Sequence, residues 1–314
     1  MGEAWVSRAR ASLAPTFYVN IDTTPDFLIH AKELFMTVTL VVSVGVADVR
    51  RDPDPSSELV TQALMNVPAV IGEFSGNWTH ITLVDYEGWI RTNELDDPIA
   101  KSYCQLEDHC CTPIQLAAVV TATHTRLYAS AQGNDMLGKV YLSTVLPLLD
   151  ISHRERLKVA LPGGSEAWFD RDVISVCQPG EIYPRASTTV ITGYARAFLG
   201  VPYLWGGTSW EGLDCSGFVQ LCYRMGDYIL PRDADQQHDI LAHDVSREAM
   251  QEGDLIFFGR KSITHVGMAL NNSEFIHSEG QDYNCVTINS FDPADKHYNP
   301  KLDEIVWGLK RVVE

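Results

Sequence analysis

Apolar and polar positions alternate in short runs along residues 36–178, which is the pattern of half-buried β-strands. The runs are rich in Val, Ile and Thr, and turn-forming residues separate them at 52–55 (DPDP), 75–77 (SGN) and 162–164 (PGG). The pattern therefore predicts that this part of the chain is all-β.

Two stretches of the β region, 78–95 and 156–174, are similar to each other. Each has an alternating strand, a turn, and a second strand that contains a tryptophan, Trp89 in one and Trp168 in the other. Bacterial SH3-like barrels end in this way, so the repeat predicts two such barrels. Two small β domains with tryptophans in their cores would account for the same residues.

The pattern changes after residue 185. Residues 188–199 carry apolar side chains at helical spacing, and a second helix is predicted to begin near Cys215 and to end at Gly226. Strand-like runs follow at 254–258, 265–270, 274–278, 285–288 and 305–312. Helices followed by an antiparallel sheet indicate an α+β domain.

These patterns divide the chain into four predicted segments. Residues 1–35 are an N-terminal extension of unassigned role, 36–105 are the first SH3-like barrel, 112–178 are the second, and 185–314 are the α+β domain. The stretch around 96–112 is predicted to be a linker.

The apolar run at 36–47 bears on where the protein acts. It is shorter than the ~20 apolar residues of a membrane span, so no membrane-spanning segment is predicted. Its Val and Thr content favours a strand over a secretory signal, and the single basic residue near it, Lys32, is followed by Glu33. We therefore expect a cytoplasmic protein, with secretion as the alternative. Met36 is itself an alternative start of the natural protein.

Composition narrows the class of protein. The 314 residues are 45% hydrophobic and 21% charged, as in soluble globular proteins, and the formal net charge is −17. Because nucleic-acid binding needs a basic face, no nucleic-acid partner is expected. The seven cysteines are odd in number and scattered, which favours a reducing compartment over a disulfide framework. Cys104, His109, Cys110 and Cys111 lack the second ligand pair of a zinc site, so neither a metal nor a cofactor is predicted.

Cys215 stands where a cysteine can become a nucleophile. The attacking species is the thiolate, and the first turn of a helix and a neighbouring imidazole both lower the pKa of a thiol. Gly212 and Gly217 leave room for close backbone approach, and amide groups near Cys215 are candidates for an oxyanion hole. Cys222 lies on the apolar side of the same helix and is expected to be inert.

Two histidines supply the base that such a cysteine needs. His265 and His277 lie on adjacent predicted strands, so both rings can face the same helix end if the strands pair. His265 would accept the thiol proton, and His277 would orient His265 through its other ring nitrogen.

The order and spacing of five motifs closely resemble the NlpC-type cysteine peptidases, a family of papain-like cell-wall peptidases. The motifs are YxWGG from Tyr203, DCSGF from Asp214, GDLIFF from Gly253, HVG from His265, and IH ending at His277. The resemblance spans about 130 residues and implies a catalytic triad of Cys215, His265 and His277, with histidine as the polar third member.

Two SH3-like domains before such a domain resemble, within this family, the γ-D-glutamyl-L-diamino acid dipeptidyl-peptidases (dipeptidyl-peptidase VI). The resemblance implies a murein-derived peptide as substrate, with release of L-Ala-γ-D-Glu from peptides that have a free N-terminal L-Ala. It also implies that the first SH3-like domain closes the non-prime end of the cleft. An ammonium group held among carboxylates excludes N-acylated peptides, because acylation would leave buried charges unpaired.

The same resemblance assigns substrate-binding residues. Asp233 matches the acidic position that binds the substrate ammonium, and Glu58 and Tyr86 are its partners from the first barrel. Relatives often have serine at the position of Ala234, so a contact to the D-Glu carboxylate is expected to be missing. The remaining pocket residues are Tyr203, Trp205, Asp214 and Ser216. The simpler alternative is that Glu58 and Tyr86 are ordinary surface and core residues of a barrel.

Three other functions stay open from the sequence. A secreted endopeptidase would act on intact peptidoglycan and use the SH3-like domains to bind the wall. A binding module without catalysis is disfavoured by the intact cysteine and two histidines. An acyltransferase or amidase of the same fold would share the thioester step.

Overall fold

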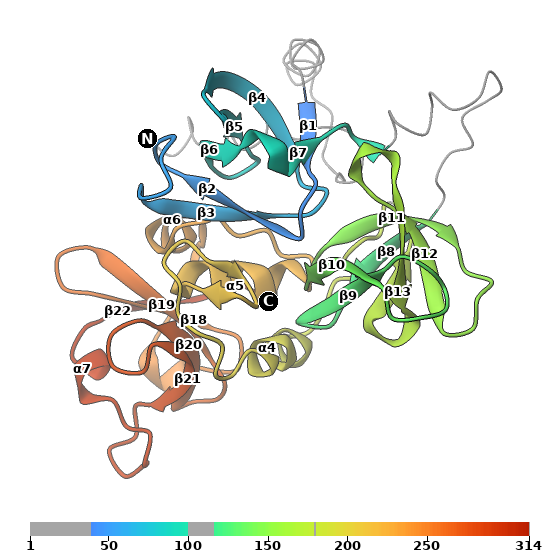
Figure 1. The fold of residues 1–314 in the computed structure, drawn as a ribbon. Helices are drawn as coiled ribbons and strands as arrows, with labels where there is room; N and C mark the ends of the chain where they lie inside the picture. The colour runs from blue at the N-terminus through green and yellow to red at the C-terminus, as the bar shows by residue number, and fades with distance from the viewer. Residues whose placement is uncertain (1–38, 100–115, 179, 314) are drawn as a thin grey trace, which may run out of the picture. The chain divides into compact units, whose positions relative to one another are not determined.

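The computed structural model describes residues 39–99, 116–178 and 180–313 (Figure 1). The predicted extension at 1–35 and the cysteine-rich stretch at 104–111 lie outside the described residues. The chain divides into two compact units, the first ending at Ile182 and the second beginning at Tyr183.

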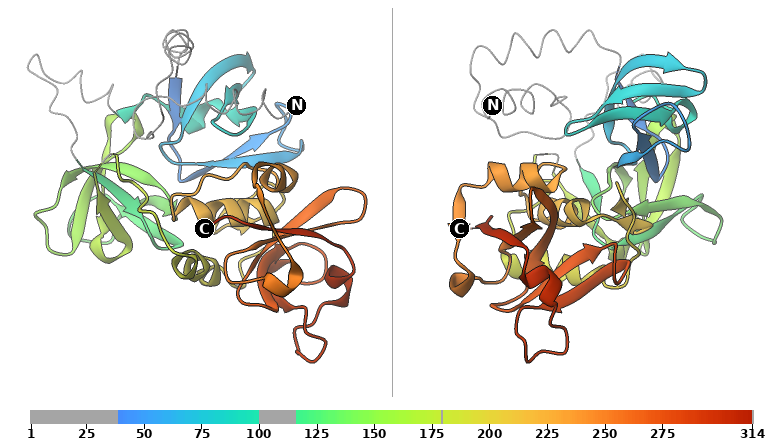
Figure 2. Two further views of the ribbon diagram at one scale, coloured as in Figure 1. Left: turned by 180° about the vertical axis from the view of Figure 1, so that it is seen from behind. Right: turned by 90° about the vertical axis from the view of Figure 1, so that its left-hand side faces the viewer.

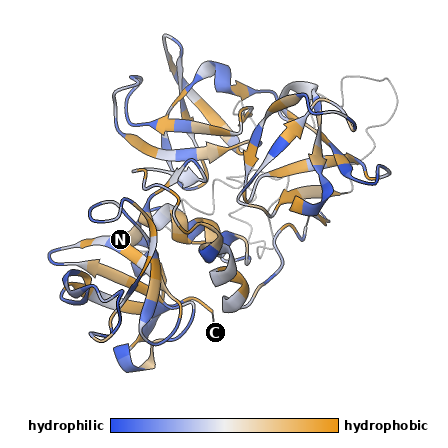
Figure 3. Ribbon diagram, turned by 60° about the horizontal axis from the view of Figure 1, so that its bottom comes forward, coloured by the Kyte–Doolittle hydropathy of each residue, from blue (hydrophilic) through white to orange (hydrophobic). Residues whose placement is uncertain are grey.

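The first unit contains a seven-stranded antiparallel sheet in the order β3-β2-β6-β5-β4-β1-β7. Its strands are β1 Thr39–Val42, β2 Val46–Arg50, β3 Leu59–Leu64, β4 Pro68–Ser75, β5 Trp78–Thr82, β6 Glu87–Arg91 and β7 Leu95–Asp96. Hydrophilic and hydrophobic positions are mixed along the strands (Figure 3), and β2 alternates between half-buried and buried residues, the buried positions being Ala47 and Val49. These residues pack with Ile81 and Ile90 in one apolar core.

A second seven-stranded antiparallel sheet follows, in the order β10-β9-β13-β12-β11-β8-β14. Its strands are β8 Ala117–Val120, β9 His124–Tyr128, β10 Met136–Tyr141, β11 Val145–Asp150, β12 Arg156–Ala160, β13 Glu166–Asp170 and β14 Ile174–Cys177. Adding seven to each strand number of the first sheet gives the order of the second. The similarity between 78–95 and 156–174 is therefore part of a repeated topology.

The repeated tryptophans do not lie in the cores, contrary to the alternative interpretation of two small β domains with tryptophans in their cores. Trp89 on β6 and Trp168 on β13 are half-buried, and Trp89 stacks edge-on against His80. The core positions of these strands are the neighbouring residues, Ile90 and Phe169. Because side chains alternate between the two faces of a strand, a buried Ile90 places Trp89 on the outer face.

The second unit is an α+β domain built on a six-stranded antiparallel sheet in the order β17-β22-β18-β19-β20-β21. The strands are β17 His243–Val245, β18 Leu255–Gly259, β19 Ile263–Ala269, β20 Glu274–Glu279, β21 Cys285–Ser290 and β22 Val306–Arg311. A short pair, β15 Thr208–Ser209 and β16 Gly212–Leu213, precedes this sheet. The four α-helices in its described part are α4 Thr188–Ala197, α5 Cys215–Arg224, α6 Ala234–Ile240 and α7 Pro300–Asp303.

Helix α5 is the centre of the second unit. All of its residues from Cys215 to Tyr223 are buried, which is expected of a helix covered on every side. It packs against α4 and against strands β19 and β20 (Figure 2). Among the described residues, none of the helices has the length and apolar character needed to cross a membrane.

Candidate active site

Cys215 is the first residue of α5 because Asp214 caps the helix. Asp214 has extended backbone (φ −87°, ψ 176°), and its Oδ1 accepts a hydrogen bond from the Gly217 N–H at 2.7 Å. The first turn of a helix has backbone N–H groups without helical partners, and a side-chain cap uses one of them. The sulfur of Cys215 is therefore held beside the positive end of the helix.

The cap is itself held by a buried arginine. Arg232 is 2% exposed, and its Nη1 and Nη2 donate to the two carboxylate oxygens of Asp214 at 3.0 and 2.5 Å. Nη1 also donates to Ser216 Oγ at 3.1 Å, and the Gly206 N–H donates to Asp214 Oδ2 at 2.9 Å. A bidentate, fully hydrogen-bonded pair is the arrangement in which two charges tolerate burial.

Two glycines near the start of α5, Gly212 and Gly217, lie so close to neighbouring atoms that a side chain would not fit. A Cβ added at Gly217 would lie 2.6 Å from the Gly207 carbonyl oxygen, and one at Gly212 would lie 2.4 Å from Leu204 Cβ. The close approach expected at these two positions is present in the structure. A larger residue at position 217 would push α5 away from the Gly207 carbonyl, and one at position 212 would push β16 away from Leu204.

His265 and His277 are neighbours across the β19–β20 pair. The antiparallel register, in which Met268 faces Ile276, puts the two histidines diagonally on one face of the sheet. His265 Nε2 and His277 Nδ1 are 2.8 Å apart, with ring planes at 75°. Helix α5 packs against both strands, so this histidine pair and Cys215 come from elements in direct contact.

The histidine pair continues into an amide. His277 Nε2 lies 2.9 Å from Oδ1 of Asn289, a residue of β21 that is fully buried. Asn299 Nδ2 donates to the same oxygen at 3.1 Å. The sequence analysis did not single out Asn289. The one signal that could have found it is its position on the strand that follows the strand of His277.

Burial governs the protonation of the cysteine and both histidines. Burial, and after it the Asp214 carboxylate, raises the pKa of Cys215 to about 12, although the N–H groups of Val266 and Ser216 oppose the shift. Burial also lowers the pKa of His277 to about 4, and burial together with His277 lowers the pKa of His265 well below its usual value. Each of these shifts favours the neutral form of its group, the protonated thiol of Cys215 and the neutral imidazoles of His265 and His277. The expected low pKa of the thiol is not found, because loss of hydration outweighs the helix end.

The proposed pocket residues of the second unit lie around this centre in two groups. Tyr203 is half-buried, and burial and then the nearby Cys215 and Asp214 raise the pKa of its hydroxyl. Trp205 exposes 61% of its surface. In contrast, Asp214 and Ser216 are buried, and their side chains are directed to Arg232.

Asp233 and Ala234 lie at the start of α6. Asp233 has extended backbone and its carbonyl accepts from the Gln237 N–H at 2.9 Å, while Ala234 is buried as the first helical residue. Gln237 Nε2 donates to the Ser216 carbonyl at 3.1 Å and to the Pro231 carbonyl at 2.9 Å. These bonds fix the start of α6 relative to the start of α5.

Glu58 and Tyr86 belong to the first unit. Glu58 precedes β3 and forms an ion pair with Arg51 at 2.7 Å, and this carboxylate raises the pKa of Arg51. Tyr86 packs against the apolar core of the first sheet. The structure thus gives each residue a local contact within its own sheet.

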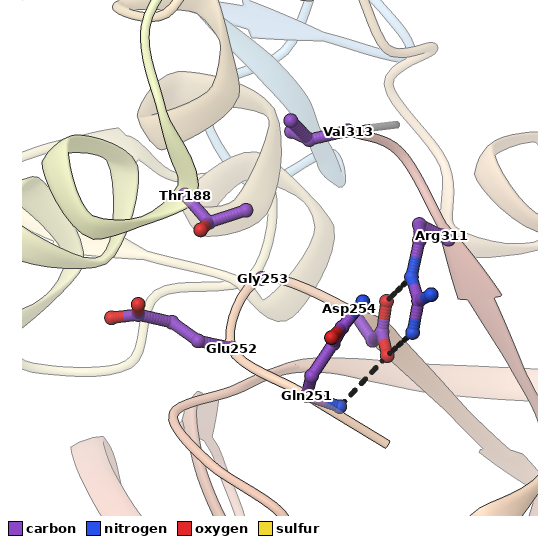
Figure 4. Close-up of a pocket in the computed structure, with 7 residues that line it drawn as sticks. All are labelled: Thr188, Gln251, Glu252, Gly253, Asp254, Arg311 and Val313. Carbon is purple, nitrogen blue, oxygen red and sulfur yellow. Dashed lines mark hydrogen bonds and ion pairs between the residues drawn. The ribbon is translucent and has the colours of Figure 1, made fainter. Parts of the chain in front are cut away.

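A separate cavity of about 350 Å³ lies elsewhere in the second unit (Figure 4). It is lined by Thr188, Gln251, Glu252, Gly253, Asp254, Arg311 and Val313. Arg311 donates to both carboxylate oxygens of Asp254, and Glu252 accepts from the hydroxyls of Thr189 and Thr192. The lining contains neither cysteine nor histidine, so this cavity offers no cysteine nucleophile and no imidazole base.

Two family models match the chain. The model described as the NlpC/P60 family matches residues 200–302, and the one described as the bacterial dipeptidyl-peptidase Sh3 domain matches 49–95. The first covers the segment from three residues after the end of α4 to within α7. The second covers most of the first seven-stranded sheet.

Curated relatives extend over most of the chain. A gamma-D-glutamyl-L-lysine dipeptidyl-peptidase from Bacillus cereus is 31% identical over 241 residues, which are 71% of this chain and 68% of the relative. A protein with the same name from Bacillus subtilis is 27% identical over 82% of this chain and 86% of its own length. The solved structure of an NlpC/P60 family protein from Bacillus cereus shares the fold, with a TM-score of 0.76 at 23% identity over 88% of this chain and 100% of that chain.

Proposed function

The chain belongs to the NlpC/P60 family of cysteine peptidases, and we propose that it hydrolyses the γ-D-Glu–L-diamino acid bond of peptides derived from peptidoglycan. The substrate carries a free N-terminal L-Ala, and the products are L-Ala-γ-D-Glu and the rest of the peptide. The proposed substrate class rests on the similarity to a gamma-D-glutamyl-L-lysine dipeptidyl-peptidase, which extends over more than two thirds of this chain and of the relative.

The reaction uses Cys215 as nucleophile and His265 as base. His265 takes the thiol proton as the sulfur attacks the γ-carbonyl carbon of D-Glu, and the new imidazolium then protonates the departing amine of the diamino acid. Water attacks the resulting thioester in the second step and regenerates the thiol. Support comes from the hydrogen-bonded pair of His265 and His277 on the strands against which α5 packs.

The neutral resting site fits this sequence of events. A thiolate is not formed beforehand, because burial raises the pKa of Cys215 to about 12. Proton transfer to His265 therefore accompanies attack on the carbonyl. Backbone N–H groups in the first turn of α5 are the donors available to the oxyanion that forms at that moment.

Recognition of the free amine is assigned to Asp233, with Glu58 and Tyr86 as the further candidates named by the resemblance. Asp233 supports this role because its start-of-helix position is fixed next to Ser216 through Gln237. Ala234 replaces the serine of many relatives, so we expect Ala234→Ser to lower KM for the peptide by a few fold. The variants Asp233→Asn, Glu58→Gln and Tyr86→Phe test the amine assignment residue by residue.

The decisive experiment compares two peptides. L-Ala-γ-D-Glu-L-Lys and its N-acetyl form are incubated with the protein, and the products are identified by mass spectrometry. We expect cleavage of the free-amine peptide and little of the acetylated one, with Cys215→Ala as the inactive control. Equal cleavage of both peptides would refute the assignment as a dipeptidyl-peptidase and would favour an endopeptidase that acts on intact cell wall.

We also propose that both seven-stranded sheets are SH3-like barrels. The first is supported by the match at 49–95, and the second by the identical strand order. A cytoplasmic location is part of the proposal, because the four cysteines in the described part of the chain are free. Fractionation of cells that carry the tagged protein tests the location.

A further inference from the structure

Two backbone groups fix the orientation of the amide that faces His277. Asn289 Nδ2 donates to the His297 carbonyl at 3.2 Å, and a carbonyl can only accept. Asn299 Oδ1 accepts from the Leu302 N–H at 3.1 Å, so its Nδ2 is the atom that donates to Asn289 Oδ1. Both contacts agree that Asn289 presents its oxygen, and not its nitrogen, to His277.

This orientation determines the tautomer of both histidines. An oxygen at 2.9 Å requires that His277 Nε2 carry the proton, and a neutral ring then has its lone pair at Nδ1. His265 Nε2, 2.8 Å from that lone pair, must in turn be the donor. The nitrogen of His265 left to accept a proton is Nδ1.

We propose that Asn289 is a positioning residue of the reaction, which selects through His277 the tautomer of His265 that can take the thiol proton at Nδ1. The inference rests on the proposed function for the identity of nucleophile and base. Asn289 itself touches neither the substrate nor the sulfur in this scheme.

The neighbours of His277 support a neutral, fixed ring. The titratable groups around it are His265 on β19, Glu279 on β20 itself, Cys215 on the adjoining α5, and, beyond Asn289, the Tyr283 hydroxyl. The Glu279 carboxylate accepts the N–H groups of Gln281, Asp282 and Tyr283, so it is engaged with the loop after β20. Asn289 is thus the neighbour of His277 Nε2 that sets its tautomer.

The test uses Asn289→Leu, which removes the acceptor, and Asn289→Asp, which keeps an oxygen but adds charge. Long-range ¹H–¹⁵N spectra of histidine-labelled protein report the tautomers, and they are recorded in the Cys215→Ala background, where activity is not needed. We expect Nε2–H forms of His265 and His277 before the change, and loss of the His277 Nε2–H form in Asn289→Leu. In the active enzyme the same change should lower kcat about ten- to a hundred-fold with little effect on KM.

Asn289→Asp gives a second readout. A carboxylate beside His277 raises the pKa of that ring, and a protonated His277 no longer accepts from His265. The acid limb of the kcat/KM profile should therefore move to higher pH by about one unit or more, while the Nε2–H form persists at high pH. If Asn289→Leu does not fold, the shift of the acid limb in Asn289→Asp is the test of the proposal. An acid limb that stays at the same pH overturns it.

Asn271→Ala is the matched control. Its side chain fixes the turn between β19 and β20 by accepting from Ser273 and Glu274, six residues from either histidine. It should leave both tautomers and kcat unchanged. Retained Nε2–H tautomers in a folded Asn289→Leu protein overturn the proposal, whereas activity in Cys215→Ala would overturn the nucleophile and leave the tautomer result standing.

Discussion

Replacing Arg232 with methionine should unfold α5 at a lower urea concentration, because the change leaves the Asp214 carboxylate buried without its cation. Arg232 and Asp214 are 2% and 7% exposed, and the two guanidinium nitrogens bind the two carboxylate oxygens. Methionine fills a similar volume, so the effect reports the charge and not a cavity.

The size of the effect follows from burial. Removing one partner of a buried ion pair costs about 3–5 kcal/mol. Asp214 keeps the N–H groups of Gly206 and Gly217, which places the expected loss at about 3 kcal/mol. The matched control is Arg260→Met, because the Arg260–Glu304 pair is 70% and 69% exposed. An exposed pair contributes about 0–1 kcal/mol.

Cys222 provides the assay. It is fully buried in the middle of α5, so its thiol reacts with an alkylating reagent only when the helix opens. Alkylation is followed by mass spectrometry against urea concentration in a Cys215→Ser background. A loss below about 1 kcal/mol, equal to that of Arg260→Met, would refute the argument. Adding Asp214→Asn to Arg232→Met should restore most of the stability, since asparagine keeps the cap oxygen and removes the charge.

Two further predictions concern protonation. Because burial raises the pKa of Cys215 to about 12, its alkylation rate in the folded enzyme should still be rising at pH 9, and a plateau near pH 7 would contradict this. His277 has its pKa lowered to about 4 in the folded state, so the unfolded chain binds the extra proton and stability is lost as pH falls from about 6.5 towards 4. The contribution is about 3 kcal/mol, and urea unfolding of His277→Gln should depend less steeply on pH in that window than the parent protein. Equal slopes would show that His277 is not the group responsible.

The sequence pattern predicted the sheet of the second unit well because its strands have strong local signals. The run predicted at 274–278 is β20, Glu274–Glu279, and the run at 285–288 is β21, Cys285–Ser290. Helix α6 was not predicted, because its sequence ADQQHDI has no apolar stripe and is held by contacts of Gln237 instead. Family membership followed from the motifs, since their residue types and spacing are local properties of the chain.

The supporting residues of the site were not predictable in the same way. Arg232 pairs with a residue 18 positions earlier, and arginine is usually exposed, so nothing in its neighbourhood marks it as buried. Asn289 meets His277 only through strand pairing. The sign of the Cys215 pKa shift also depends on burial, which a motif does not contain. The β region was correctly predicted to consist of strands. Whether Trp89 and Trp168 lie on the core face or on the outer face of their sheets depends on where the core forms, which the local sequence does not show.

The buried, protonated state of Cys215 has a consequence for chemical damage. Peroxide oxidises thiolates far faster than thiols, and sulfenic acid is the first step towards irreversible forms. A thiol whose pKa is raised to about 12 is therefore a slow target while the enzyme waits for substrate. In the proposed mechanism the sulfur gives up its proton as it attacks the bound carbonyl, and at that moment the substrate competes with any oxidant. The burial that raises the pKa of this thiol therefore also slows its oxidation by peroxide.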